Sequence, residues 1–179
     1  MLQIVVPEQE LYVPSEKRFY QIKRTTLNLE HSLISLSKWE AKYKKPFLDA
    51  SKKTVKETLD YIHCMTINPT IDDMVYLALT NADIARVEAY IADPMTATRF
   101  TEYGPKRPNK QIITSELIYY WMVTANIPFE CQKWHLNRLL TLIRICGEKS
   151  NPKKMSRRDA ARSNAALNAA RRAAAKSHG

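Results

Sequence analysis

The pattern of hydrophobic and polar residues changes at about residue 28. Before that point the runs QIVVP, ELYV and RFYQIKRTT are rich in β-branched and aromatic residues, which favour strands, and Pro7 and Pro14 interrupt them. We therefore expect residues 1–28 to form a short β-hairpin or meander that packs on the rest of the chain.

From Leu29 onward the apolar residues recur every three or four positions, as in amphipathic helices. The first helix is expected to run from Leu29 until Pro46 stops it. A threonine followed three residues later by an acidic residue predicts a helix start, and the chain has three such pairs: Thr54 and Glu57, Thr70 and Asp73, Thr80 and Asp83. The helix that begins at Thr54 is expected to have an apolar side made of Val55, Leu59 and Ile62. The helix that begins at Thr70 is expected to end at Leu79, and the helix that begins at Thr80 to end at Ile91.

The segment TATRFTEYGPKRPNKQIIT, residues 96–114, interrupts the helical period. Two short β-like arms, TATRF and QIIT, flank EYGPKRPNK, which has one glycine, two prolines and three basic residues. This pattern predicts a projecting hairpin or loop. A plain solvated connection between two helices explains the same composition equally well.

The next stretch is the densest in tryptophan and cysteine. Ser115 is expected to cap a helix over 116–126, Pro128 to end it, and a second helix to run from about Cys131 to a stop at Gly147. Apolar residues cover most of the second helix, which is typical of a central helix. The predicted core is one buried cluster of Leu33, Leu36, Trp39, Leu59, Ile62, Leu77, Ile91, Leu117, Trp121, Leu136, Leu139, Leu140 and Ile143.

The net charge of +10 is concentrated at the end of the chain. Residues 151–179 have eight lysines and arginines against one acidic residue, Asp159, whereas residues 1–150 have twenty against seventeen. The tail is rich in alanine, and Ser156 with Asp159 forms a capping sequence, so we expect an exposed basic helix over 156–175. The fold class is therefore mainly α, with a β segment at 1–28, a compact multi-helix body at 29–150 and a basic tail at 151–179.

The sequence offers no complete catalytic or metal-binding motif. Cys131 and His135 are four residues apart and could face one metal ion, but a tetrahedral site takes four ligands. Ser35 with Lys38 matches S-x-x-K, and His135 with Arg138 matches the H-x-x-R of recombinases, in both cases without the companion motifs. We expect no enzyme activity, no cofactor, no metal and no membrane span, and the odd number of cysteines favours a reducing compartment.

Several segments resemble a known family of phage proteins. LEHSLISLSKWEAKYKKPF, ETLDYIHCMT, ITSELIYYWM, IPFECQKWHLNRLLTLIRIC and PKKMSRRDAARSNAALNAARRAAA look like the tail assembly chaperones of siphophages, which are tailed bacteriophages. The resemblance spans roughly residues 27–176 and includes no catalytic motif. It implies a non-enzymatic helper that holds tape measure and tail tube subunits in the host cell cytoplasm and is absent from the mature virion.

The resemblance does not imply a defined set of binding residues. Charge alone suggests the basic residues of the loop and the tail as the partner-binding candidates: Lys106, Arg107, Lys110, Lys153, Lys154, Arg157, Arg158, Arg162, Arg171 and Arg172. Self-association of the chain is a further partner hypothesis. The alternative function is a basic phage protein that binds nucleic acid through its tail. Aromatic residues interleaved with basic ones, as in single-strand binders, occur only around Tyr20 and Tyr43.

Overall fold

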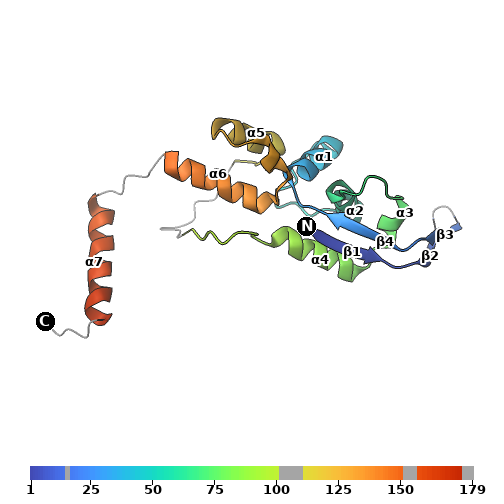
Figure 1. Ribbon diagram of the computed structural model, residues 1–179, viewed down its shortest axis with the longest axis horizontal. Helices are drawn as coiled ribbons and strands as arrows, with labels where there is room; N and C mark the ends of the chain where they lie inside the picture. Colours follow the sequence, from blue (N-terminus) through green and yellow to red (C-terminus); the bar gives the residue numbers. More distant parts are fainter. Residues whose placement is uncertain (15–16, 101–110, 151–156, 175–179) are drawn as a thin grey trace. The chain divides into compact units, whose positions relative to one another are not determined.

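The computed structural model describes residues 1–14, 17–100, 111–150 and 157–174 (Figure 1). The described chain is mainly α-helical, with four short strands near the N-terminus, as the sequence predicts. It forms two compact units, Met1–Arg144 and Ile145–Gly179.

The four strands are the two halves of one long hairpin, residues 2–29, which we call the ribbon. β1 (Leu2–Val6) pairs antiparallel with β4 (Thr25–Leu29), and β2 (Gln9–Val13) pairs antiparallel with β3 (Arg18–Ile22). Leu2 faces Leu29 and Gln9 faces Ile22. Gln9 lies seven residues after Leu2, and its partner Ile22 lies seven residues before Leu29. The register is therefore kept across the break, where Pro7 offers no backbone N–H to the ladder. The predicted N-terminal hairpin is confirmed.

Helix α1 (Leu33–Tyr43) follows the ribbon. The backbone N–H groups of Ser32 and Ser35 each donate to the hydroxyl of the other residue, which is a capping box without an acidic residue. The helix ends at Lys44, which adopts a left-handed conformation with φ 55°. The predicted start at Leu29 is wrong, because Leu29 still pairs in the ribbon as the last residue of β4.

Two further helices begin where the sequence predicts. α2 (Val55–Met65) and α4 (Asn81–Ala92) are capped by Thr54 and Thr80, and in each case the acidic residue three positions later completes the capping box. The apolar side predicted for α2 is wrong at its first residue, because Val55 is 73% exposed. Val55 lies about two turns before Ile62 on the same face and extends beyond the core.

The third predicted helix is much shorter than expected. α3 spans only Met74–Leu77, and Asp73 makes no side-chain cap. The carboxylate of Asp72 accepts the backbone N–H of Met74 instead, at 3.0 Å. The helix cannot continue to Leu79, because Thr80 has to adopt the extended conformation of a helix cap, with ψ 162°.

α5 (Ser115–Thr124) begins one residue earlier than predicted. Thr114 is its cap, and its hydroxyl accepts the backbone N–H of Leu117 at 3.4 Å. Ser115 instead donates its backbone N–H to the buried carboxylate of Glu40, at 2.7 Å. Glu40 therefore ties the start of α5 to α1.

The second helix of this stretch begins later than predicted. Cys131 lies in a 3-10 turn, Phe129–Lys133, and α6 spans Leu136–Ser150. His135 is still extended, because it forms a β-bridge with Ser32. The predicted stop at Gly147 is wrong, because Gly147 lies inside α6, which continues to Ser150, and its φ is not left-handed.

The core is centred on α1 rather than on α6. α1 packs against α2, α5 and the 3-10 turn, whereas Leu140 and Ile143 of α6 are only half-buried. Of the predicted core, six residues are buried: Leu33, Leu36, Trp39, Ile62, Leu136 and Leu139. Leu77 is 47% exposed, because α3 ends there. The prediction also missed the inner face of the ribbon, where alternate residues are buried: Ile4, Val6, Ile22, Leu27 and Leu29.

The loop and the tail complete the described chain. Residues 96–100 and 111–114 form no strand, so the predicted β-like arms are not present there, and residues 102–110 of the predicted hairpin lie outside the described residues. α7 (Arg157–Ala174) occupies the place of the expected basic helix, and its described side chains are all exposed.

Candidate binding pocket

The structure describes three of the ten side chains predicted to bind a partner. Arg162, Arg171 and Arg172 are exposed on α7. Arg162 and Arg171 are nine residues apart, which is two and a half turns and about 14 Å along a helix axis, so they lie on opposite sides of α7 and do not form one compact site. The side chains of the other seven lie outside the described residues: Arg157 and Arg158 of α7, and Lys106, Arg107, Lys110, Lys153 and Lys154.

An apolar pocket lies in the first unit, between α2, α4 and the loop that joins α1 to α2. Its volume is about 440 Å³, within the range of about 300–1,000 Å³ that is usual for ligand pockets. The apolar part of its lining is Phe47, Tyr61, Ile62, Ile84, Val87 and Ile91, and the polar part is Lys52, Lys53, Thr58 and Glu88. None of the ten predicted residues lines this pocket.

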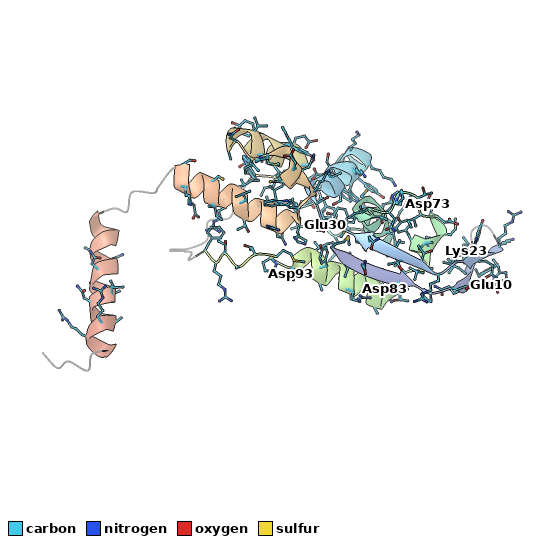
Figure 2. All side chains as sticks on the ribbon, viewed as in Figure 1. Glu10, Lys23, Glu30, Asp73, Asp83 and Asp93 are labelled. Carbon is cyan, nitrogen blue, oxygen red and sulfur yellow. The ribbon has the colours of Figure 1, made fainter. Side chains whose placement is uncertain are left out.

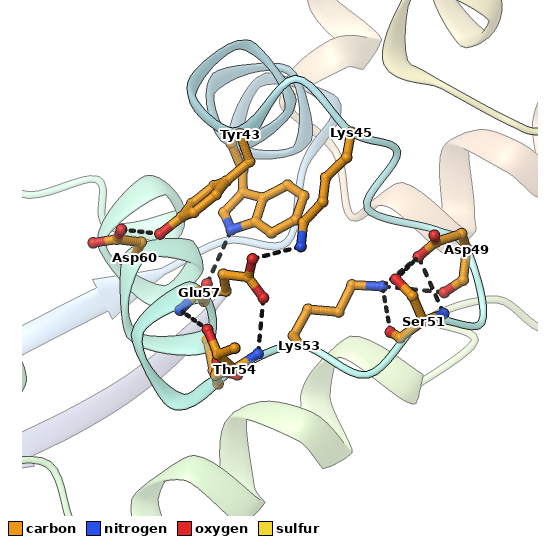
Figure 3. Close-up of polar contacts among 10 residues, drawn as sticks. Tyr43, Lys45, Asp49, Ser51, Lys53, Thr54, Glu57 and Asp60 are labelled. Atoms are coloured by element: carbon orange, nitrogen blue, oxygen red, sulfur yellow. Dashed lines mark hydrogen bonds and ion pairs between the residues drawn. The ribbon is translucent and has the colours of Figure 1, made fainter.

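The loop above the pocket is fixed to α2 through Glu57 (Figure 3). One carboxylate oxygen of Glu57 lies 2.5 Å from Nζ of Lys45, and the other accepts the backbone N–H of Thr54 at 2.8 Å. The contact with Lys45 is the main reason why the pKa of Glu57 is lowered. The indole N–H of Trp39 donates to the carbonyl of Glu57 at 2.9 Å, so α1 and α2 are held together at the same residue.

A second polar contact shapes the loop itself. Nζ of Lys53 donates to the Asp49 carboxylate at 2.8 Å and to the Ser51 carbonyl at 3.1 Å (Figure 3). The hydrogen bond from Lys53 is the main cause that lowers the pKa of Asp49 to about 2. The same ammonium group lies 5.2 Å from the centre of the Phe47 ring. The charge of Lys53 is thus engaged within the loop.

The aromatic wall of the pocket is held by the core. Phe47 stacks on Tyr61 with ring centroids 3.8 Å apart, and Tyr61 is 2% exposed. The backbone N–H of Phe47 donates to the buried carboxylate of Glu40 at 2.9 Å. Glu40 therefore fixes both the pocket loop and the start of α5, and its position in a lysine-rich helix gave no sign of this role.

The charges at the rim that remain available are Lys52 and Glu88. Both side chains are exposed, and neither makes a hydrogen bond or ion pair with another described residue. The Thr58 hydroxyl is engaged, because it donates to the carbonyl of Thr54 at 3.1 Å. The pocket thus offers an apolar surface with one positive and one negative charge beside it.

Two buried histidines form a separate polar cluster. His31 and His135 have ring centroids 5.1 Å apart, and Nδ1 of His31 is hydrogen-bonded to the Tyr61 hydroxyl at 2.6 Å. Nε2 of His135 donates to the Tyr90 carbonyl at 3.0 Å, as expected for a hydrogen-bonded core histidine. Among the described residues, no group of three or more His, Cys, Asp or Glu could hold a metal ion. The sequence paired His135 with Cys131 and missed His31, because nothing local links residues so far apart.

Comparison with protein-family models, with curated proteins and with solved structures found no match to this chain. No helix within the described ranges is long and apolar enough to cross a membrane.

Proposed function

We propose that this chain is a non-enzymatic tail assembly chaperone of a siphophage, which binds tape measure or tail tube subunits during tail assembly. The resemblance of five sequence segments to that family is the origin of the proposal. The chaperone would act in the host cell cytoplasm and leave the tail before the virion matures.

The apolar pocket is the observation that supports a protein-binding role. A chaperone has to cover apolar side chains of a subunit that has not yet found its place. A pocket lined by Ile84, Val87 and Phe47 can accept such side chains, and burial of apolar surface is the main favourable term in protein association. The free charges of Lys52 and Glu88 can then select the polar residues that flank the apolar segment.

The polar lining favours binding over catalysis. A catalytic site needs a nucleophile, an acid or a base within hydrogen-bond reach of a reacting group. In this pocket Lys53 is engaged with Asp49 and Thr58 with a backbone carbonyl, and the two remaining charged side chains, Lys52 and Glu88, are exposed at the rim. The tail adds exposed arginines on more than one side of α7, which would contact acidic regions of the same client.

Co-expression with candidate tape measure and tail tube proteins, followed by pull-down, tests the proposal. Ile84→Lys places a charge in the pocket and should abolish capture, because a buried unpaired charge opposes binding. Ile112→Lys is the matched control, since Ile112 is 65% exposed and does not line the pocket. Circular dichroism should show the same helicity for both variants. Failure of the wild-type chain to capture any tail protein would refute the proposal.

Nucleic-acid binding is the second candidate function, and the distal part of the ribbon favours it. Tyr12 and Phe19 are both exposed there, with ring centroids 4.8 Å apart. Lys17 and Arg18 are exposed beside them, and Lys23, labelled in Figure 2, is exposed further back, at the break between β3 and β4. Exposed aromatic rings next to basic side chains are what single-strand binders use.

A gel-shift titration separates the two functions. If nucleic acid is the partner, a single-stranded oligonucleotide should bind with a dissociation constant below about 1 µM, which is below the range of about 1–100 µM that is usual for non-specific binding. Phe19→Ser should weaken that binding, since one stacked base contributes about 1–3 kcal/mol. Binding only in the non-specific range, with capture of a tail protein, would leave the chaperone proposal standing.

A further inference from the structure

The two outer edges of the strand pair β1–β4 differ. The edge of β4 is covered by the chain that follows α2, where the backbone N–H of Ile67 donates to the Asn28 carbonyl at 2.9 Å. The side-chain carbonyl of Asn68 accepts the Asn28 N–H at 2.8 Å, and its NH₂ group donates to the Thr26 carbonyl at 3.1 Å. Both backbone groups of Asn28 on this edge are therefore hydrogen-bonded.

These contacts also fix which backbone groups of β1 point outward. In an antiparallel pair, opposite residues either exchange both hydrogen bonds or turn their N–H and C=O groups away from each other. Asn28 turns both groups away from β1 and faces Gln3 in the register, so the backbone groups of Gln3 point away from β4. The pattern repeats every two residues, which gives Val5 the same orientation.

The outer edge of β1 is largely free. The Gln3 carbonyl accepts one hydrogen bond from the Arg86 guanidinium of α4, at 3.2 Å. Among the described residues, nothing is hydrogen-bonded to the N–H of Gln3 or to the N–H and C=O of Val5. The side chains of Gln3 and Val5 are also exposed. Unpaired backbone groups at the spacing of an extended chain are a template for one more strand.

Helix α4 packs against β1 beside this edge (Figure 1). Ala82, Arg86 and Ala89 are spaced by four and three positions, so they share one side of the helix. That side is next to β1, because Arg86 reaches Gln3 from it. Both alanines are exposed and small, which leaves room on either side of the guanidinium. A strand added to β1 would cover them with the side chains that it turns towards α4.

Arg86 supplies the charge of this site. A guanidinium has five N–H donors, and within the described chain that of Arg86 contacts the Gln3 carbonyl and, at 3.7 Å, one oxygen of Asp83. The other oxygen of Asp83 belongs to the helix cap, where it accepts the Thr80 N–H at 3.1 Å. The Arg86 side chain is 56% exposed, so its remaining donors can bind an incoming carboxylate.

We propose that β1 binds an extended segment of a partner protein as an added strand, and that an acidic side chain of this segment binds Arg86. Backbone hydrogen bonds to Gln3 and Val5 would supply affinity, and the side chains that face α4 would supply selectivity. Side chains alternate along a strand, so the acidic residue would have apolar residues two positions before and after it, over Ala82 and Ala89.

A second copy of this chain does not meet these requirements at β1. The strand Leu2–Val6 has no acidic residue, and pairing of β1 with itself would bring two Arg86 side chains together. Like charges placed together oppose association. The added strand also does not depend on the client proposed above, since any partner with an extended acidic segment of this kind can bind.

Synthetic peptides test the proposal on the full chain. TVTDTVT places a valine two positions to either side of a central aspartate, and TVTKTVT is its control. NMR titration should show that the N–H groups of Gln3 and Val5 shift and become protected from exchange when TVTDTVT binds, whereas those of Ile4 and Val6 already face β4. A contact this small is weak, with an expected dissociation constant of about 0.1–1 mM. No change at Gln3 and Val5 with about 5 mM TVTDTVT overturns the proposal.

The charge of Arg86 should decide which peptide is preferred. The wild type should bind TVTDTVT at least about fivefold tighter than TVTKTVT, and Arg86→Glu should reverse this order. Lys56→Glu is the matched control, because it makes the same change of charge at an exposed position of α2, and it should keep the wild-type order. If Arg86→Glu still prefers the aspartate peptide, Arg86 does not bind the acidic side chain.

Val5→Pro tests the strand edge itself. Proline removes an N–H that points away from β4, so the variant should keep the circular dichroism of the wild type and bind neither peptide. Unfolding of this variant would mean that the Val5 N–H faces β4, which contradicts the proposal. Protection of the Gln3 and Val5 N–H groups that rises with protein concentration, without peptide, would show that a second copy fills the edge and would overturn it as well.

Discussion

The buried histidine pair makes the stability of the first unit depend on pH. His31 is 1% exposed, and its ring lies 5.1 Å from that of His135. Burial, and in second place the charge of His135, lowers the pKa of His31 from 6.5 to about 3. The Tyr61 hydroxyl lies 2.6 Å from its Nδ1 and the second imidazole lies beside its ring, and among the described residues no carboxylate forms a hydrogen bond or ion pair with His31.

The sign and size of the effect follow from the two pKa values. Below about pH 6.5 His31 binds a proton in the unfolded chain, whereas in the folded chain the His31 side chain remains neutral until the pH approaches its lowered pKa of about 3. The free energy of unfolding therefore falls as the pH falls through this window, by up to about 1.4 kcal/mol per pH unit. Between about pH 7 and pH 5 the expected loss from His31 alone is about 2 kcal/mol.

Urea unfolding at several pH values, followed by tryptophan fluorescence, measures this loss. His31→Gln removes the titrating group, so its free energy of unfolding should be lower at neutral pH but nearly constant down to about pH 5. His63→Gln is the control, because the His63 side chain is 55% exposed, and it should keep the wild-type slope. If the wild-type free energy of unfolding changes by less than about 0.5 kcal/mol between pH 7 and pH 5, the reasoning about His31 is wrong.

Three further predictions concern packing and organisation. Leu36→Ala should lower the free energy of unfolding, measured in urea, by about 2–5 kcal/mol, because Leu36 is fully buried on the central helix α1. Leu140→Ala should lower it by less in the same assay, because Leu140 is only half-buried. Glu40→Ala leaves two backbone N–H groups without their acceptor and should cost about 1–3 kcal/mol for each that stays buried, measured in the same way. Deletion of residues 151–179 should leave the thermal midpoint of the first unit unchanged in circular dichroism, because the deleted residues all belong to the second unit.

The elements that the sequence predicted well are those with local causes. The capping boxes at Thr54 and Thr80 form from side chains three residues apart, so neither needs the rest of the fold. The same pattern at Thr70 failed, because Asp72 competed for the helix start and α4 required an extended Thr80. The strand pairing at Leu29 and the bridge at His135 depend on residues far away in sequence, so helical periodicity alone placed both helix starts wrongly.

The pocket could not be predicted from the sequence for the same reason. Its lining comes from the loop after α1, from α2 and from α4, and each of these residues looks like an ordinary core or surface position by itself. Basic residues stand out in the sequence without any knowledge of the fold, so they were chosen as binding candidates. A free strand edge is harder to recognise, since its unpaired backbone groups depend on which strands pair and not on the side chains of β1.

The constant register of the ribbon has a consequence during synthesis of the chain. The four strands pair with one another within the first 29 residues, so the hairpin can find this pairing on the ribosome before the helices emerge. A two-stranded hairpin is only marginally stable alone, and its inner face, with Ile4 and Leu27, stays uncovered until α2 and α4 have been made. The growing chain thus exposes an apolar strand pair for the time needed to add about sixty residues, several seconds at ordinary translation rates. During that interval neighbouring ribosomes on one message would bring such strand pairs close together, and the early, fixed pairing limits their exchange between chains.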